Sequence, residues 1–441
     1  MALADKISKY KKLIDEGEFT ESSGIVKNVV GLTVESRGPT VKMGDICEIF
    51  PSEDAPPVLA EVVGFRDQTV ILMPFSDVTG IGAGNKVVAT GEEFRIGVGE
   101  KLRGMVLDGL GRPMDGSPLP EPEAYYPIEN DPPNPLDRER IHDILPIGVR
   151  AIDALLTMGR GQRIGIFAGS GVGKSTLLGM IARRASADIN VITLVGERGR
   201  EVLDFIEKDL KEEGLARSVL VIATSDTPAL MRLKSAMVGT AIAEFFRDQG
   251  YNVMLMMDSL TRFAMAQREI GMTVGEPPVS RGFPPSVYTK LPRLLERSGT
   301  SKKGSITAIY TVLVEGDDMN EPIADTVRGI VDGHFVLSRK LANNNQYPAI
   351  DVLASVSRLM HDIVTPDHWK MASYIRNMMT EYNGVQDLIS IGAYSPGSNP
   401  VTDTAIALHE PILTMLKQEI GEEATFEQML NMLGVITKNM R

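Results

Sequence analysis

The 441-residue sequence contains little of several features that would define a class of protein. Cysteine occurs once, at Cys47, which excludes an internal disulfide and any metal site built from several cysteines, and is typical of a reducing compartment. No apolar run approaches the ~18 residues of a membrane span, and the opening MALADKISKYKK lacks the apolar core of a secretion signal. We therefore expect a cytoplasmic protein.

Positive charge and aromatic side chains are also scarce. Lys and Arg number 46 against 58 Asp and Glu, which gives a net charge of -12, and aromatic residues make up 5% of the chain. Binding of nucleic acid without sequence preference depends on clustered Lys and Arg, so this composition argues against it. Glycine, in contrast, is abundant: there are 42, and they are clustered rather than scattered.

Three regimes follow one another along the chain. Within residues 1–18, apolar residues recur at steps of four and three, which predicts a short amphipathic helix. Short apolar runs separated by turn residues fill residues 19–90 and predict a small barrel or sandwich. In residues 91–357, continuous apolar runs alternate with helix-compatible segments, the pattern of a parallel sheet covered on both faces. Residues 358–441 contain helical segments only.

The segment AGSGVGKST follows one of these apolar runs and opens a helix. Its glycines let backbone N–H groups turn toward phosphate oxygens, Lys174 can reach the β- and γ-phosphates, and the Ser175 hydroxyl can bind Mg²⁺. Ala168 replaces the first glycine of the G-x-x-x-x-G-K-[ST] pattern, and its small side chain preserves the packing of strand against loop. The residues expected to bind the phosphates are Gly169, Ser170, Gly171, Val172, Gly173, Lys174, Ser175 and Thr176.

Three further segments supply candidate side chains. Asp258 ends the apolar run NVMLMMD, where a phosphate-loop protein carries its Mg²⁺-side carboxylate. In GERGRE, Glu197 could polarise an attacking water, although the same letters fit a surface turn before a charged helix. In YPAIDVLASVSR, Tyr347 could stack on adenine and Arg358 could act as an arginine finger, and the pattern alone leaves both roles open.

With these motifs the chain resembles the flagellar type III protein-export ATPases, relatives of the catalytic subunit of rotary ATP synthases. The resemblance spans essentially the whole length. It rests on FAGSGVGKSTLLGMIAR, TLVGERGREV, DSLTRFAMAQREIG, GEPPVSRGFPPSVYTKLPRLLERSG and VLVEGDDMNEPIADTVRGIVDGHFVLSRKLA. The last two blocks favour the type III export branch over the ATP synthase subunits, and virulence secretion ATPases share much of both.

The resemblance implies an α/β multidomain protein: an N-terminal β-barrel, a RecA-like phosphate-loop domain with helices on both faces of its sheet, and a C-terminal helical domain. It implies Mg²⁺-dependent ATP hydrolysis that powers protein export, in a cytoplasmic homohexamer that docks at the inner face of the cell membrane. The implied partners are export chaperones, a regulatory stalk protein and components of the export gate.

The resemblance also implies residue roles. Glu197 matches the carboxylate that activates the hydrolytic water, Tyr347 the aromatic residue beside adenine, and Arg358 the finger supplied by a neighbouring protomer. Arg198 matches the next residue of the GER motif, and Arg262 an arginine near the phosphates. The implied catalytic residues are Lys174, Glu197, Arg198, Arg262 and Arg358, and the implied metal ligands are Ser175 and Asp258.

Alternative functions share the same core. A virulence secretion ATPase differs in its apparatus rather than in its chemistry. A hexameric nucleic-acid translocase should carry basic, aromatic-bearing surface, which a net charge of -12 disfavours. A non-catalytic ring subunit should lack the carboxylate of Glu197 or carry a damaged phosphate loop, and neither is the case here.

Overall fold

The computed structural model describes residues 22–438 with the exception of residues 53, 315 and 317. The amphipathic helix expected over residues 1–18 lies outside the described residues. The contacts divide the chain into two compact units, one that ends at Phe94 and one that comprises Arg95–Arg441. None of the helices in the described part of the chain is long and apolar enough to cross a membrane.

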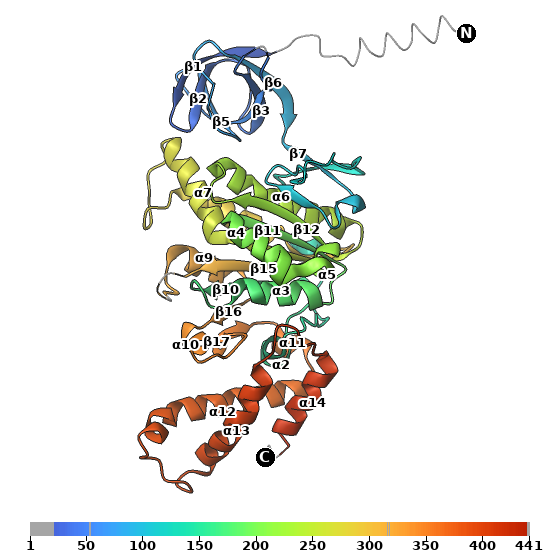
Figure 1. The fold of residues 1–441 in the computed structure, drawn as a ribbon, viewed down its shortest axis with the longest axis vertical. Helices are drawn as coiled ribbons and strands as arrows, with labels where there is room; N and C mark the ends of the chain where they lie inside the picture. Colours follow the sequence, from blue (N-terminus) through green and yellow to red (C-terminus); the bar gives the residue numbers. More distant parts are fainter. Residues whose placement is uncertain (1–21, 53, 315, 317, 439–441) are drawn as a thin grey trace, which may run out of the picture. The chain divides into compact units, whose positions relative to one another are not determined.

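The first unit is a closed barrel of antiparallel strands in the order β1-β2-β5-β4-β3-β6 (Figure 1). Its interior holds apolar side chains such as Val34, Leu72 and Val87, together with Cys47, and burial raises the pKa of the Cys47 thiol to about 12. The strands are β1 (Ser23–Val30), β2 (Thr33–Arg37), β3 (Asp45–Phe50), β4 (Val58–Arg66), β5 (Thr69–Pro74) and β6 (Lys86–Glu93). Of the two alternatives that the apolar runs left open, the barrel is confirmed.

The second unit is built on a sheet in the order β17-β16-β10-β15-β13-β11-β12-β8, in which β14 pairs with β15. Neighbouring strands are parallel except that β17 is antiparallel to β16 and β14 to β15. A separate ribbon pairs β7 (Arg95–Val98) with β9 (Ala124–Pro127). The strands of the sheet are β8 (Val106–Asp108), β10 (Arg163–Ala168), β11 (Ile189–Glu197), β12 (Ser218–Thr224), β13 (Asn252–Asp258), β14 (Gly299–Thr300), β15 (Ser305–Leu313), β16 (Gly333–Leu337) and β17 (Ile350–Ser357).

Helices cover both faces of this sheet, as the continuous apolar runs predict. On β11, Ile192 and Leu194 belong to the same core cluster as Leu177 of α3, whereas Thr193, which points the other way, lies against Gly239 of α6. The helices packed around the sheet are α3 (Lys174–Arg184), α4 (Gly199–Asp204), the π-helical turn η3 (Phe205–Leu210), α5 (Lys211–Ala216), α6 (Ala229–Asp248), α7 (Leu260–Thr273), α8 (Pro285–Glu296) and α9 (Pro322–Ile330).

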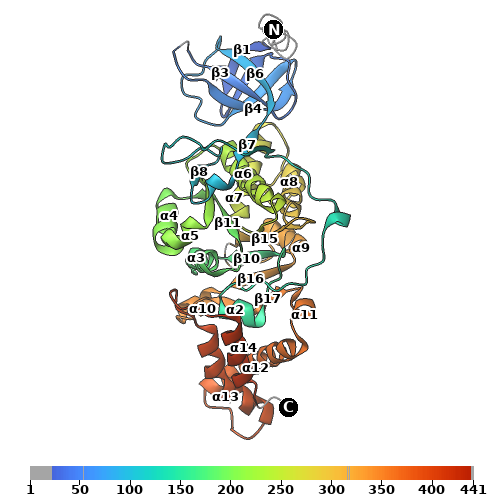
Figure 2. The same ribbon diagram turned by 90° about the vertical axis from the view of Figure 1, so that its right-hand side faces the viewer.

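The C-terminal part of the second unit is helical (Figures 1 and 2). Its long helices α12 and α13 pack against one another, and α14 packs on α2. Its buried residues, such as Ile375, Met415 and Leu433, join the same core cluster as the sheet. The remaining helices are α2 (Arg150–Leu155), α10 (Arg339–Asn343), α11 (Met360–Ile363), α12 (Pro366–Ser390), α13 (Pro400–Leu416) and α14 (Phe426–Ile436), with short 3₁₀ turns at Glu100–Leu102 and Pro135–Asp137.

Candidate nucleotide-binding site

The loop between β10 and α3 has the backbone geometry of a phosphate cradle. Gly171 and Gly173 have φ angles of 76° and 88°, a left-handed region that glycine enters without strain. Gly173 is the N-cap of α3, and no side chain caps that helix end, so the N–H groups of its first turn are free to bind an anion. Gly169 is not among the glycines with positive φ, so the loop turns on the other two.

Three charged side chains meet next to this loop. The Lys174 ammonium lies 2.5 Å from Oδ1 of Asp258 and 3.5 Å from Oε1 of Glu197. The three side chains come from α3, β13 and β11, and each is at most 16% exposed. Asp258 and Glu197 end their strands at the same edge of the sheet, where ligands of parallel sheets bind. The structure therefore brings together three of the side chains that the sequence singled out.

Burial and charge set the proton affinities of this cluster. Burial and the charge of Asp258 raise the pKa of Glu197 to about 7, and the Lys174 ammonium offsets only part of this effect. Burial alone would lower the pKa of Lys174, but the two carboxylates outweigh it and raise the value. Lys174 is therefore charged, and Glu197 can exchange a proton near neutral pH.

The two arginines expected at the phosphates lie differently. Arg198 points into solvent, with a side chain that is 79% exposed and 3.8 Å from the Glu201 carboxylate. Arg262 packs under Gly196, and its Nε is buried without a hydrogen-bond partner. Arg262 thus has an unsatisfied donor and packs against Gly196, the residue that precedes Glu197. Arg198 makes no contact with Lys174 or Asp258.

A cavity of about 780 Å³ adjoins the phosphate loop, and it has the size of a small-molecule site. Its lining includes Gly171, Gly173 and Leu177, and the half-exposed ring of Tyr347 lies next to Gly173. An aromatic ring beside a phosphate loop is suited to stack on a nucleotide base. The role of Tyr347 beside adenine stays a prediction.

The lining of this cavity also contains residues that the sequence analysis missed. Gln418 donates its backbone N–H to the carbonyl of Tyr347 and its side-chain amide to that of Gly148. Its side-chain oxygen accepts the backbone N–H of Arg150, whose guanidinium pairs with Glu422. No motif marks Gln418, and only the fold brings it to Arg150, which lies 268 positions away in the chain.

Arg358 lies at the other end of the sheet from the cluster. Because β17 is antiparallel to β16, the last residue of β17, Ser357, pairs with Gly333 at the start of β16. Leu337 at the end of β16 pairs with Ala168, which precedes the phosphate loop. Arg358 therefore follows β17 at the opposite edge of the sheet. Its exposed side chain donates a hydrogen bond to the carbonyl of Arg328. Within its own chain it does not contact the phosphate loop.

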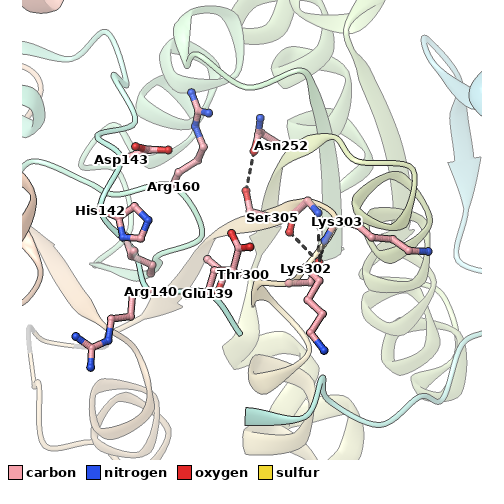
Figure 3. Close-up of a pocket in the computed structure, with 13 residues that line it drawn as sticks. Glu139, Arg140, His142, Asp143, Arg160, Asn252, Thr300, Lys302, Lys303 and Ser305 are labelled. Carbon is pink, nitrogen blue, oxygen red and sulfur yellow. Dashed lines mark hydrogen bonds between the residues drawn. The ribbon is translucent and has the colours of Figure 1, made fainter. Parts of the chain in front are cut away.

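A second hollow, of about 150 Å³, lies at that opposite edge, where β13 and β15 begin (Figure 3). Arg140, Lys302 and Lys303 contribute to its lining, but Figure 3 shows their charged ends pointing away from one another. Divergent cations do not create a common anion site. The nucleotide site is therefore assigned to the phosphate-loop edge.

Comparison with known families agrees with this geometry. Residues 26–91 match the β-barrel domain of the ATP synthase alpha/beta family, residues 148–357 its nucleotide-binding domain, and residues 364–434 the T3SS EscN ATPase C-terminal domain. The flagellum-specific ATP synthase of Bacillus subtilis is 54% identical over 435 residues, which cover 98% of this chain and 99% of the relative. The chain belongs to the family of flagellar and type III secretion ATPases.

Virulence relatives and solved structures place the chain in the same family. The type 3 secretion system ATPase of Xanthomonas euvesicatoria is 50% identical over 94% of both chains. The assembled ATPase EscN from the type III secretion system of enteropathogenic E. coli superimposes with a TM-score of 0.89 at 48% identity, over 94% of this chain and 99% of that one. A second structure holds EscN in complex with its central stalk EscO, with a TM-score of 0.88.

Proposed function

We propose that this chain hydrolyses ATP at the phosphate-loop edge of its sheet and that the reaction drives protein export through a flagellar type III apparatus. The observation that carries the proposal is the buried cluster of Lys174, Glu197 and Asp258 beside an uncapped helix N-terminus. A non-catalytic nucleotide-binding subunit would need Lys174 and Asp258 only. Glu197, whose pKa is about 7, is the group that adds hydrolysis.

In the proposed reaction a water attacks the γ-phosphorus in line with the leaving oxygen. Lys174 and the loop N–H groups hold the triphosphate and neutralise its charge, while Glu197 orients the water and accepts its proton. Arg262, whose buried Nε has no hydrogen-bond partner and whose side chain packs against Gly196, is proposed to bind a phosphate oxygen. We assign Arg198, which is exposed, to contacts outside the cluster of its own chain.

The residues present also suit Mg²⁺. Asp258 and the hydroxyl of Ser175 supply hard oxygen donors, and among the described residues no group of three or more His, Cys, Asp or Glu side chains could hold a metal by itself. This donor set is typical of an ion bound through nucleotide phosphates and one or two protein ligands. Mg²⁺ bound there would neutralise charge on the β- and γ-phosphates.

The position of Arg358 supports a finger supplied in trans. Since Arg358 lies at the edge of the sheet opposite its own phosphate loop, it can complete only the site of another protomer. Arginine fingers contribute on the order of 10³–10⁵ in rate, so each site is nearly inactive until a neighbour supplies one. The assembled EscN structures support a ring, which we propose to be a homohexamer with a central stalk protein as partner.

The flagellar apparatus is favoured over a virulence system because the flagellum-specific relative from B. subtilis shares more of the sequence than the Xanthomonas protein does. We place the ring in the cytoplasm, docked at the membrane through export-gate components and supplied with cargo by chaperones. The ends of β6 at Glu93 and of β17 at Ser357 support domain borders near residues 91 and 358.

The proposal is tested by phosphate release from ATP with purified full-length protein, with Mg²⁺ and with EDTA. Hydrolysis should require Mg²⁺, and Lys174→Ala should abolish both nucleotide binding and hydrolysis, because the loop then lacks the ammonium group that neutralises the phosphates. Lys208→Ala, which removes an exposed lysine of the π turn, is the matched control and should behave as wild type. Hydrolysis by Lys174→Ala at the wild-type rate would refute the proposed site.

A further inference from the structure

Asp258 has a second neighbour that no motif marks. Its strand β13 runs parallel to β15 with Met257 opposite Tyr310, so Asp258 and Thr311 are the next residues on the two strands. The Thr311 hydroxyl lies 2.7 Å from Oδ1 of Asp258 and 3.5 Å from the carbonyl of Met257. Thr311 is fully buried and Asp258 is 3% exposed, so water does not compete for this bond.

The direction of this hydrogen bond follows from its partners. A carboxylate only accepts, so the Thr311 hydroxyl donates its single hydrogen, and the shorter contact shows that it goes to Asp258 rather than to Met257. The same Oδ1 also accepts from the Lys174 ammonium at 2.5 Å. Two donors from two different elements therefore hold one oxygen of the carboxylate.

The other oxygen of Asp258 is left available. In the described part of the chain no hydrogen bond reaches Oδ2, which thus remains available as an acceptor. A carboxylate that is held at one oxygen can present the other in a fixed direction, and partners of this kind tune the affinity of metal sites. Thr311 is suited to this task because a β-branched side chain on a strand has little rotamer freedom.

We infer that Thr311 is a positioning residue for Asp258: its hydroxyl fixes the carboxylate so that Oδ2 points toward the Mg²⁺ of a bound nucleotide. The inference rests on the proposed function of the site. In a purely structural role the hydroxyl would only satisfy a buried carboxylate. The positioning role predicts instead that loss of the hydroxyl weakens the response to Mg²⁺, while the fold and the binding of nucleotide without Mg²⁺ are kept.

The test compares Thr311→Val, which keeps the shape and removes the hydroxyl, with Thr311→Ser, which keeps the hydroxyl. Equilibrium binding of a fluorescent ADP analogue to the full-length protein is measured in EDTA and across a Mg²⁺ titration, with thermal unfolding alongside. Thr311→Val should need on the order of 10-fold more Mg²⁺ for its half-maximal effect, with unchanged affinity in EDTA. Thr311→Ser should titrate as wild type does, and Thr311→Ala should follow Thr311→Val if valine does not fold.

Three results would overturn the inference. They are a wild-type Mg²⁺ titration for Thr311→Val, equal impairment of the valine and serine variants, and a parallel loss of affinity in EDTA, which would indicate damage to the phosphate loop instead. If Mg²⁺ does not affect nucleotide binding by the wild-type protein, the proposed function fails as well. If the wild-type protein responds to Mg²⁺ and Thr311→Val responds in the same way, only the positioning role of Thr311 is refuted.

Discussion

At the scale of single residues, the nucleotide site depends on one lysine placed between two carboxylates. Lys174 neutralises part of the charge of Asp258 and Glu197, and all three side chains are largely shielded from water. Burial disfavours the charged form of Glu197, and the charge of Asp258 adds to this effect, so the pKa of Glu197 rises to about 7. The base of the proposed reaction is thereby matched to neutral pH.

The pH dependence of hydrolysis follows from this value. Glu197 must be ionised to accept a proton, and a raised pKa means that it is protonated below about pH 7 in the free protein. The kcat/KM for ATP should therefore rise as pH increases toward about 7 and then level off, with a slope of about tenfold per pH unit on the acidic side. Steady-state kinetics across this range measure the profile.

The nucleotide titrates in the same range, so its contribution must be measured separately. Glu197→Gln lacks the titrating carboxylate, and the pH dependence of nucleotide binding to this variant reports the nucleotide alone. A wild-type kcat/KM profile that stays flat through about pH 7 after this correction would contradict the assignment of Glu197 as the base.

At the scale of elements, the cavity beside Tyr347 is lined by segments that are distant in the chain. The end of α13 and the turn that follows it reach back to Arg150 at the start of α2 and to Tyr347 before β17, mainly through Gln418. Gln418 is 4% exposed and makes four hydrogen bonds with its backbone N–H and side chain. Hydrogen bonds of Gln418 thus connect the C-terminal helices to the lining of this cavity.

Replacing Gln418 by methionine preserves its volume and removes its side-chain hydrogen bonds. The buried N–H of Arg150 and the carbonyl of Gly148 lose their partners, which should lower the free energy of unfolding by about 2 kcal/mol and raise the KM for ATP. Urea denaturation and steady-state kinetics check the two effects. Lys417→Met, an exposed neighbour in the same cavity, should change the unfolding free energy by less than about 0.5 kcal/mol. Equal effects of both variants would argue against the connecting role of Gln418.

Much of this fold is predictable because local signals agree with it. The continuous apolar runs mark β10, β11, β12, β13 and β15, and the glycine-rich segment marks the phosphate loop between β10 and α3. β2 was not predicted, because its sequence TVESR has few apolar residues. The charged helix expected after GERGRE is interrupted by a π turn at Phe205–Leu210. Thr311 and Gln418 could not be predicted, since their roles arise from strand register and from contacts across the chain.

At the scale of the whole molecule, we propose that one chain carries an incomplete site. The cluster around Lys174 and the finger candidate Arg358 lie at opposite edges of one sheet, so the complete site that we propose combines residues of two chains. A ring in which every interface is equivalent supplies each site with one such arginine. Activity should therefore depend on assembly, and the specific activity should rise steeply with protein concentration.

Mixing two inactive variants tests this arrangement. Arg358→Ala removes the finger and Glu197→Gln the base, so each homogeneous ring should be nearly inactive. In mixed rings some interfaces combine an intact Glu197 with an intact Arg358 from the neighbour, and phosphate release should recover in part. Arg376→Ala serves as the control for Arg358→Ala. It removes an arginine on α12 and leaves Glu197 intact, so rings of this variant alone should be active. The absence of any recovery in mixed, assembled rings would exclude a finger in trans.

The central claim, that Glu197 makes this nucleotide site hydrolytic, is tested most directly by Glu197→Gln. Nucleotide binding and Mg²⁺-dependent phosphate release are measured on the same preparation, beside Glu207→Gln as an exposed control on the neighbouring π turn. The account predicts that Glu197→Gln binds nucleotide as wild type does and hydrolyses ATP at least about 100-fold more slowly, while Glu207→Gln is unchanged. Hydrolysis by Glu197→Gln at the wild-type rate would contradict it.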